Sequence, residues 1–334
     1  MSEQILRPSP ISASVDYDED GVQHGFLSIP YSHDESAWGS IRMPICVIRN
    51  GDGPTALLTG GNHGDEYEGP IALYNLAASL DPATVTGRVI ILPALNYPAF
   101  RAGRRTSPID SGNMNRSFPG RPDGTITQKI ADYVSRHLLP VADLVADIHS
   151  GGRTLEMTPF AAHHILPDKE HESRCRDAVM AFGAPFSIAM LELDAVGMLD
   201  TSVETLGKTF VTTELGGGGS STPETVAVAK NGIHNILQHV GILEGSPKPA
   251  DTTWLDMPDG DCFVVSDEEG LVEPCVSLGQ DVKAGEIVAR IHRIERTGTP
   301  PTDYRAKRDG ILIGRHFPGR VTIGDCLGVL GMKV

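Results

Sequence analysis

The sequence predicts an α/β fold: a mostly parallel mixed sheet flanked by helices, followed by a small C-terminal all-β domain. Two observations support this prediction. Short apolar runs alternate with helical patterns between residues 41 and 245, and such alternation favours a parallel sheet with helices on both faces. After residue 250 the segments are strand-length, rich in Val, Ile, Gly and Asp, and without a helical pattern, which is typical of a small β-sandwich.

The order of the elements follows from these runs. Residues 1–40 are polar, and we expect them to be irregular. The expected strands are 42–48, 55–60, 88–93, 143–148, 160–166 and 209–213. The expected helices are 67–80, 126–138, 170–182 and 223–240. Residues 245–250, Gly-Ser-Pro-Lys-Pro-Ala, have the composition of a linker. The chain is therefore expected to divide into an irregular segment (1–40), a main domain (41–245) and a β domain (251–334).

The C-terminal segment contains an approximate internal repeat. Residues 279–288 resemble residues 319–328, and both have the pattern of a strand, a glycine turn and a second strand. Two similar halves predict a sandwich that resembles the biotinyl/lipoyl-carrier type of domain. No lysine lies at a hairpin tip in the usual Met-Lys context, so we expect no covalent cofactor there.

Composition narrows the class of protein. The net charge of −15 argues against a nucleic-acid partner, because phosphate binding needs a basic face. No stretch approaches the roughly 20 apolar residues of a membrane span, and the first thirty residues hold no apolar signal core. The five cysteines are scattered without a Cys-x-x-Cys pair, as in reduced thiols. We therefore expect a cytoplasmic protein that binds neither nucleic acid nor membrane, and a homodimer would suit a chain of this size.

The most informative stretch is 59–69, Thr-Gly-Gly-Asn-His-Gly-Asp-Glu-Tyr-Glu-Gly. It places His63 and Glu66 on a glycine-rich turn between an expected strand and an expected helix, which is where open α/β sheets bind ligands. His149 follows another expected strand and precedes two glycines. Two imidazoles and one carboxylate that meet at this edge would form a His₂Glu site for one Zn²⁺ with an open position, the ligand set of a hydrolase. Asp147 could orient one ligand from behind.

A further carboxylate ends a third expected strand. Glu214 follows the run 209–213 and precedes four glycines, which would let the backbone approach a ligand closely. A carboxylate beside an open zinc position can take a proton from water and later return it to a leaving group.

Arginines form the fourth element. Asn115 and Arg116 follow a loop that carries Arg101, Arg104 and Arg105. An arginine can grip a carboxylate through two parallel hydrogen bonds, and an arginine near a metal can stabilise an oxyanion.

Each of these features alone has an ordinary explanation. Most His-x-x-Glu turns are solvated, a histidine after a strand is usually a hydrogen-bonded structural residue, and arginine clusters are usually surface charge. A glycine run is more often a flexible loop or a phosphate cradle, although the Gly-Lys-Ser/Thr ending of a phosphate loop is missing here. The case rests on the coincidence that His63 with Glu66, His149 and Glu214 each end a different expected strand beside glycine.

These motifs resemble the succinylglutamate desuccinylase/aspartoacylase family, a branch of the zinc carboxypeptidase superfamily. The resemblance rests on four stretches in order and covers roughly residues 55–220. The stretches are 61–66 (Gly-Asn-His-Gly-Asp-Glu), 115–120 (Asn-Arg-Ser-Phe-Pro-Gly), 147–151 (Asp-Ile-His-Ser-Gly) and 213–216 (Thr-Glu-Leu-Gly). A small β-rich tail is also a family feature, and residues 41–245 would then be the catalytic domain.

The resemblance implies a role for each residue. His63, Glu66 and His149 would hold one zinc ion per chain, and Glu214 would be the general base and acid. Asn115 and Arg116 would bind the substrate carboxylate. Arg105 would polarise the scissile carbonyl, with Arg104 as the alternative register. These roles assign the whole set of candidate site residues: His63, Glu66, Arg105, Asn115, Arg116, His149 and Glu214.

The substrate side chain would need a further group. A second carboxylate would require another arginine, for which Arg153 is the nearest candidate. An ammonium group could instead be received by Glu156 or by an acid within residues 191–194.

The implied activity is a zinc-dependent amidohydrolase acting on a small N-acyl amino acid. Four stretches, 6–11, 22–25, 36–40 and 105–110, resemble family members that act on N-α-acetyl-L-2,4-diaminobutyrate in ectoine degradation, and this compound is the expected substrate. The alternatives are an aspartoacylase- or succinylglutamate desuccinylase-type deacylase, or a carboxypeptidase, on the same scaffold. An alternative of another class is a non-catalytic interaction module with structural zinc.

Overall fold

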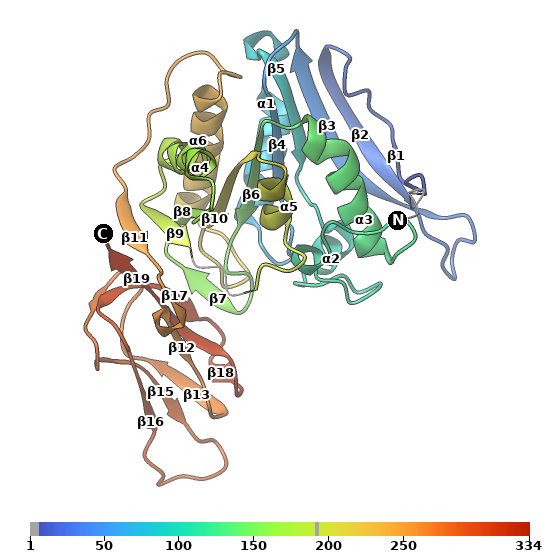
Figure 1. The fold of residues 1–334 in the computed structure, drawn as a ribbon. Helices are drawn as coiled ribbons and strands as arrows, with labels where there is room; N and C mark the ends of the chain where they lie inside the picture. The colour runs from blue at the N-terminus through green and yellow to red at the C-terminus, as the bar shows by residue number, and fades with distance from the viewer. Residues whose placement is uncertain (1–6, 191–193) are drawn as a thin grey trace, which may run out of the picture.

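The computed structural model describes residues 7–190 and 194–334. Its main feature is one large mixed sheet with helices on both faces, and a smaller antiparallel sheet projects from one end of the molecule (Figure 1). The expected fold class is therefore confirmed. Within the described residues, no helix combines the length and the apolar character that a membrane span needs.

Four parallel strands form the centre of the large sheet. They lie in the order β5 (Gly87–Leu92), β4 (Thr55–Gly60), β6 (Leu144–His149) and β10 (Thr209–Glu214). Successive side chains of a strand point to opposite faces, and here both faces are buried. In β4, for example, Leu57 packs into one hydrophobic cluster and Leu58 into the other. This explains why the strands are continuous apolar runs.

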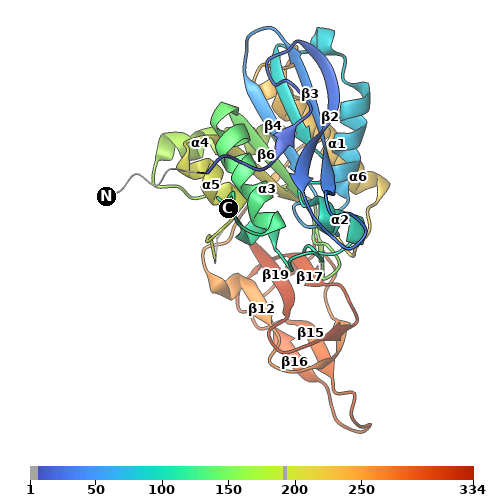
Figure 2. The same ribbon diagram turned by 90° about the vertical axis from the view of Figure 1, so that its right-hand side faces the viewer.

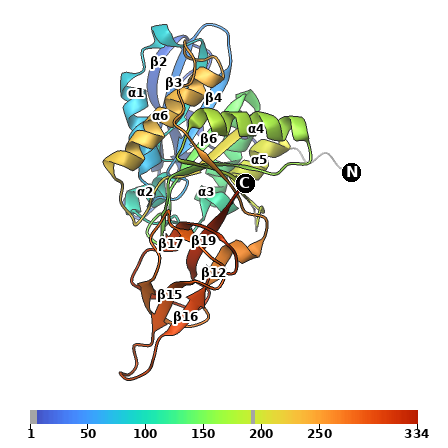
Figure 3. The ribbon, with the colours of Figure 1, turned by 90° about the vertical axis from the view of Figure 1, so that its left-hand side faces the viewer.

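Helices cover both faces of these strands. On one face, α1 (Glu68–Ser79), α4 (Lys169–Phe182) and α6 (Pro223–His239) contribute to one cluster with the sheet (Figure 3). On the other face, α3 (Ile126–Tyr133) and α5 (Leu199–Thr205) contribute to the second cluster. The helix ends are set locally. Thr222 and Thr225 form a capping box at the start of α6.

The expected elements lie within two residues of their predicted ends, with one exception. The helix expected at 126–138 is α-helical only to Tyr133 and continues as a π-helical turn over Val134–Leu138. Elements between residues 41 and 245 that the sequence did not predict include the short helix α2 (Tyr97–Ala102), the short strand β7 (Leu155–Met157), β9 (Phe186–Met190) and α5.

The N-terminal segment corrects one prediction. Residues 1–40 were expected to be irregular, but β2 (Gly21–Pro30) pairs along its whole length with β3 (Ser40–Asn50) (Figure 2). The short strand β1 (Ser12–Ala13) pairs in turn with β2 (Figure 1). The sequence of β2 mixes Gly, Gln and His with apolar residues, so it lacks a clean alternation. Ten backbone pairings with β3 override this weak local preference.

The large sheet continues into the C-terminal segment. Beyond β10 it runs through β8 (Phe160–His164) and β9 to β11 (Thr253–Asp256), and then through β19 (Cys326–Lys333) to β17 (Gly310–His316). Residues 245–250 have no regular structure, as expected of a linker, yet backbone pairing crosses the proposed boundary through β9 and β11.

A four-stranded antiparallel sheet completes this segment. Its strands are, in order, β16 (Thr302–Arg305), β15 (Ile287–His292), β13 (Gly270–Pro274) and β18 (Arg320–Val321). The internal repeat is confirmed, because β14 (Asp281–Val282) and β15 are joined through Gly285 in the same way as β18 and β19 are joined through Gly324. The short strands β7 (Leu155–Met157) and β12 (Phe263–Val265) pair with β17 and β19.

We expect Ile313→Ala to lower the free energy of unfolding by about 2–5 kcal/mol. Ile313 is fully buried in a cluster that joins Phe160 and Ile188 of the main domain to Leu255 and Val329 of the tail. Denaturant unfolding would measure this change. Ile323, which is 72% exposed, provides the matched control, and Ile323→Ala should change stability by no more than about 0.5 kcal/mol. Equal effects of the two substitutions would contradict the packing described here.

Candidate metal centre

Three adjacent parallel strands bring the candidate residues together. His149 is the last residue of β6, Glu214 is the last residue of β10, and the two are register partners, so their side chains lie on the same face of the sheet. His63 and Glu66 lie on the turn between β4 and α1. Because β4, β6 and β10 are neighbours and run in the same direction, their carboxyl ends meet at one edge. This is the usual ligand-binding edge of an open α/β sheet.

The turn after β4 is shaped by glycine. A Cβ atom on Gly64 would lie 2.0 Å from the carbonyl carbon of Ala99, so the turn packs directly on the backbone of α2. Gly61 adopts a φ of +62°, a backbone conformation that residues other than glycine rarely adopt. The glycine-rich sequence therefore fixes the position of His63 against α2.

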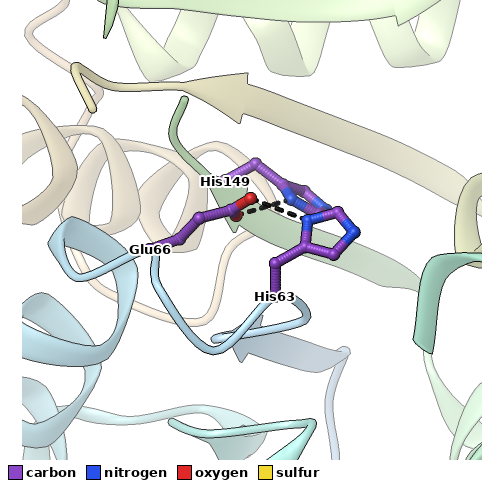
Figure 4. A group of neighbouring side chains, drawn as sticks. All are labelled: His63, Glu66 and His149. Atoms are coloured by element: carbon purple, nitrogen blue, oxygen red, sulfur yellow. Dashed lines mark hydrogen bonds and ion pairs between the residues drawn. The ribbon is translucent and has the colours of Figure 1, made fainter. Parts of the chain in front are cut away.

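Two imidazoles and a carboxylate converge at this edge (Figure 4). Glu66 Oε1 lies 2.7 Å from His63 Nδ1, and Glu66 Oε2 lies 2.8 Å from His149 Nδ1. One ligand atom from each residue lies within 4.8 Å of the other two, and all three side chains are buried. The structure thus brings together the three residues expected to bind a metal.

The far nitrogen of each imidazole is also hydrogen-bonded. His149 Nε2 lies 2.7 Å from Asp147 Oδ2, so Asp147 orients this ring as expected. Asn62 Nδ2 donates to the same Asp147 oxygen at 2.7 Å. His63 Nε2 lies 3.2 Å from Asn113 Oδ1. In both rings, Nε2 is occupied by a hydrogen-bond partner and Nδ1 faces Glu66. A hydrogen bond to one ring nitrogen of a histidine fixes the ring so that the other nitrogen can bind a metal.

The pKa values of the two imidazoles and the carboxylate each depend on the charges of their neighbours. Burial lowers the pKa of His149, but the Asp147 and Glu66 carboxylates raise it well above its usual value. Burial raises the pKa of Glu66, but the two imidazoles outweigh this effect and lower it. The pKa of His63 is lowered because burial outweighs the attraction of Glu66. The carboxylate at the centre is therefore ionised and requires positive charge beside it.

This donor set fits a divalent metal ion. Both Nδ1 atoms and the Glu66 carboxylate already point at one buried region, and second partners hold both imidazoles. Imidazole nitrogen with a carboxylate is a zinc ligand set that leaves room for a further group. Asp147, Glu66 and Glu214 place three carboxyl groups in this buried region, and a cation would balance their charge.

Glu214 has the surroundings of a general base. Its Oε2 atom is buried and has no hydrogen-bond partner among the described residues. Burial, together with the neighbouring Glu66 carboxylate, raises the pKa of Glu214 to about 8. A carboxyl group held this way, beside a possible metal site, can exchange a proton near neutral pH.

The arginines differ in position. Arg105 Nη1 lies 3.3 Å from His63 Nδ1 and 3.7 Å from Glu66 Oε1, so Arg105 faces the candidate metal centre. For Arg104, only a backbone bond to Ala99 is present among the described contacts. Of these two arginines, the contacts therefore place Arg105 beside the candidate metal centre.

Asn115 and Arg116 lie at one side of the site. The Asn115 side-chain oxygen accepts a hydrogen bond from the Leu199 backbone at 2.9 Å, so it anchors the start of α5. Arg116 Nε lies 3.4 Å from Asp194 Oδ2. Among the described contacts, none joins either residue directly to the His63, Glu66 and His149 group.

The candidates for the substrate side chain are also placed. Arg153 donates its backbone N–H to Asp65, and its side chain extends past Gly219 toward Gly103. Glu156 pairs with Arg315 at 2.9 Å. Within the stretch 191–194, Glu192 lies outside the described residues, and Asp194 faces Arg116.

The four glycines after Glu214 pack closely against the loop that follows His149. All four, Gly216 to Gly219, have positive φ angles, and a Cβ on Gly217 would lie 2.1 Å from the Leu155 carbonyl oxygen. Gly218 donates to the same carbonyl at 2.9 Å. The close approach is therefore to β7 in the loop after His149, and this packing ties the His149 and Glu214 loops together.

Sequence reasoning missed the partners that hold the ligands. Asn113 and Asn62 are single amides within longer motifs, and their partners lie 50 and 85 positions away. Asn113 also caps the short helical turn Met114–Arg116 through its side chain. One local indication of this capping role was present in the sequence, because an asparagine directly precedes the turn that contains the Asn-Arg pair.

The chain as a whole is similar to known proteins. Residues 52–240 match the model of the succinylglutamate desuccinylase/aspartoacylase catalytic domain. The chain is 56% identical over 330 residues to an N-alpha-acetyl-L-2,4-diaminobutyric acid deacetylase of Halomonas elongata, covering 98% of this chain and 96% of that protein.

Solved structures are similar over the same length. The product-bound ectoine utilization protein EutE (DoeB) of Ruegeria pomeroyi is 58% identical, with a TM-score of 0.96 over 98% of this chain and 99% of that one. A succinylglutamate desuccinylase/aspartoacylase structure from Rhodobacter sphaeroides is 40% identical, with a TM-score of 0.93 over 98% of this chain and 100% of that one.

The fold and the site define an α/β protein with a buried His₂Glu group, able to hold a metal ion, at the carboxyl ends of its parallel strands. The chain belongs to the succinylglutamate desuccinylase/aspartoacylase family.

We expect Asp147→Asn to weaken metal binding by about 10- to 100-fold, because the carboxylate that orients His149 is lost while the shape is kept. Zinc affinity should be measured by chelator competition. Asp251→Asn, at an exposed position directly after the linker, is the control and should bind zinc as tightly as the unaltered protein. Unchanged zinc affinity in Asp147→Asn would show that this hydrogen bond does not support the ligand.

Proposed function

We propose that this chain is a zinc-dependent amidohydrolase that converts N-α-acetyl-L-2,4-diaminobutyrate to acetate and L-2,4-diaminobutyrate, a step of ectoine degradation. One observation carries the reaction type: Glu214 lies beside the His63, Glu66 and His149 group as a buried carboxyl with an unpaired oxygen. The substrate is proposed from the relatives, because the Halomonas elongata protein is named for this deacetylation and is 56% identical along almost the whole chain.

The proposed metal ligands are His63, Glu66 and His149. Zinc bound there would act as a Lewis acid and lower the pKa of water to about 7. Asp147 and Asn113 keep the two imidazoles in the orientation that directs Nδ1 at this position.

Glu214 is proposed to move the proton. Its carboxylate takes a proton from the attacking water, whose oxygen forms a bond to the acetyl carbon. Glu214 then gives this proton to the leaving amine nitrogen as the amide bond breaks, which regenerates the carboxylate. The same burial that raises the pKa of Glu214 makes its carboxylate a better proton acceptor, and positive charge beside it would keep it ionised at neutral pH.

Arg105 is proposed to stabilise the oxyanion. Its guanidinium lies beside His63 and Glu66, where the carbonyl oxygen of a bound substrate would gain negative charge.

Arg116, with Asn115, is proposed to hold the α-carboxylate of the substrate. Asp194 lies next to Arg116, so a substrate held there would bring its side chain near an acid, which suits an ammonium group better than a second carboxylate.

The proposed setting is the cytoplasm. The five cysteines are all unpaired thiols in the structure, and three of them are buried. This use of cysteine is typical of a reducing compartment.

We further propose that residues 41–245 form the catalytic domain and residues 251–334 a β domain, with the large sheet continuing across the boundary.

The substrate proposal is tested by acetate or succinate release from three compounds under the same conditions. The zinc-loaded protein should cleave N-α-acetyl-L-2,4-diaminobutyrate with a kcat/KM at least about 100-fold above those for N-acetylaspartate and N-succinylglutamate. The physical reason is the acid beside Arg116. Preference for a dicarboxylate would overturn the substrate and keep the mechanism, whereas no cleavage of any compound would favour a non-catalytic protein.

The proton-transfer role is tested by Glu214→Gln. This change keeps the shape of the side chain but removes the base, so kcat should fall by about 10²- to 10⁴-fold. Zinc content should stay at one ion per chain, because Glu214 is not a proposed ligand. Glu244→Gln, at an exposed position, is the control and should retain full activity. A Glu214→Gln protein that holds zinc and keeps its activity would rule out this mechanism.

A further inference from the structure

The loop between α2 and α3 supplies two side chains that contact His63. Arg105, near the start of this loop, places its Nη1 atom 3.3 Å from His63 Nδ1. Asn113, further along, places its Oδ1 atom 3.2 Å from His63 Nε2. The imidazole is thus contacted on both of its nitrogens from one loop. The shape of the intervening residues 106–112 therefore decides where both contacting side chains lie.

The intervening residues form a closed loop. Ser107 donates its backbone N–H to the Gly112 carbonyl at 2.9 Å, which joins the chain just after Arg105 to the chain just before Asn113. The Ser107 hydroxyl in turn accepts a hydrogen bond from the Ile109 backbone at 3.2 Å. Ser107 is buried, so water competes little for these bonds. A displacement of the closed loop would move both contacting residues.

The Asp110 carboxylate joins this closed loop to α3. Its Oδ1 atom accepts hydrogen bonds from the Gly112 backbone at 3.1 Å and from the Thr127 hydroxyl at 2.8 Å. Its Oδ2 atom accepts the Thr127 backbone N–H at 2.8 Å. Burial raises the pKa of Asp110, but hydrogen bonds from Thr127 and Ser107 outweigh this effect and lower it. Asp110 is therefore an ionised acceptor, and hydrogen bonds to an ionised group are the stronger kind.

The backbone of the closed loop is strained. Ser111 has a φ of +54°, the one positive φ outside glycine among the residues that the structure describes. Such a conformation persists only where the surrounding contacts outweigh its cost. A Cβ atom on Gly112 would lie 2.2 Å from Thr127 Oγ1, so the loop also contacts the first turn of α3 directly. The hydrogen bonds of Asp110 stabilise this strained conformation against α3.

We infer that Asp110 is a positioning residue, which through the closed loop sets Arg105 and Asn113 against the two nitrogens of His63. Asp110 acts indirectly, because its hydrogen bonds go to the loop itself and to Thr127. For Arg105 the inference rests on the proposed function, in which this arginine stabilises the oxyanion. For Asn113 it rests only on the contact with His63, so this part does not depend on the reaction.

The residues proposed to bind the substrate carboxylate are held separately. Leu199 donates its backbone N–H to Asn115 Oδ1 at 2.9 Å, and Phe118 donates its backbone N–H to the Gly197 carbonyl at 2.9 Å. These bonds tie residues 115–118 to the start of α5 and not to Asp110. Loss of the Asp110 carboxylate should therefore change turnover and metal affinity more than it changes substrate affinity.

Asp110→Ala tests the inference in the full-length protein. In the zinc-saturated variant, kcat should fall about 10- to 100-fold while KM stays within about threefold. Zinc affinity, measured by chelator competition, should fall about tenfold. Asp110→Asn keeps one acceptor oxygen, so its effects should lie between those of Asp110→Ala and the wild type. Thr127→Val removes only the hydroxyl donor and should give a smaller change in the same direction, which keeps the inference testable if Asp110→Ala does not fold.

Asp168→Ala is the matched control. Asp168 also accepts hydrogen bonds at the start of a helix, from the Glu170 backbone at 3.0 Å and the His171 backbone at 3.2 Å. Its loss removes the same kind of bond from α4. The control should lower stability in denaturant unfolding but leave kcat, KM and zinc affinity unchanged.

Two double-variant cycles show through which side chains Asp110 acts. In an Arg105→Ala background, adding Asp110→Ala should lower kcat by no more than about a further twofold, because the guanidinium that the loop positions is already gone. In an Asn113→Ala background, adding Asp110→Ala should lower zinc affinity by no more than about a further twofold. A purely structural role would give the same loss in every background.

Three results would overturn the inference. One is a folded Asp110→Ala protein with the kcat and zinc affinity of the wild type. Another is a loss of kcat and zinc affinity that Asp168→Ala reproduces. The third is a full further loss in both double variants. A wild-type protein that cleaves no N-acyl amino acid would instead overturn the proposed function, and the zinc cycle with Asn113 would still decide whether Asp110 positions the loop.

Discussion

The Glu66 carboxylate is the interaction on which the rest of the site depends. It is buried, and a buried carboxylate remains ionised only if positive charge and hydrogen-bond donors surround it. Its two oxygens are divided between His63 on the turn after β4 and His149 at the end of β6. The neighbouring parallel strands therefore have to end at the same edge of the sheet, and the turn that carries Glu66 has to press against α2 through Gly64.

The surrounding charges follow from this arrangement. Asp147 holds the far side of His149, and the ionised Glu66 helps to raise the pKa of Glu214 to about 8. Arg105 adds permanent positive charge at this edge, with its Nη1 atom 3.7 Å from Glu66 Oε1. A divalent cation between the two imidazoles would therefore balance the local charge, lower the pKa of Glu214 again and make that carboxylate available as a base. The affinity of this site for a cation and the strength of Glu214 as a base would therefore both depend on the charge of the same buried carboxylates.

The sequence predicted the parts of the site that depend on local patterns. His63, His149 and Glu214 could be placed because each follows a continuous apolar run and precedes glycine, and such runs mark buried parallel strands. Asn113, Asn62 and Asp65 could not be placed, because their roles arise only when residues 50 or more positions apart come together. The strand β2 was missed for a related reason: its mixed sequence becomes a strand through pairing with β3. Residues 115 and 116 were predicted by resemblance, and the structure adds the neighbour, Asp194, that bears on the substrate.

The tail explains a feature that the active-site residues alone leave unexplained, the run of four glycines after Glu214. Gly216 and Gly218 bond to the loop that follows His149, and Gly217 fits there because a side chain would strike the Leu155 carbonyl. Leu155 begins β7, whose other edge pairs with β17 of the tail, and the Glu156–Arg315 ion pair joins the same two strands. The backbone that carries His149 and Glu214 is thus held between the main sheet and the C-terminal segment. Because buried ligands tolerate little displacement, a tail that packs on this loop contributes to the site without supplying a ligand.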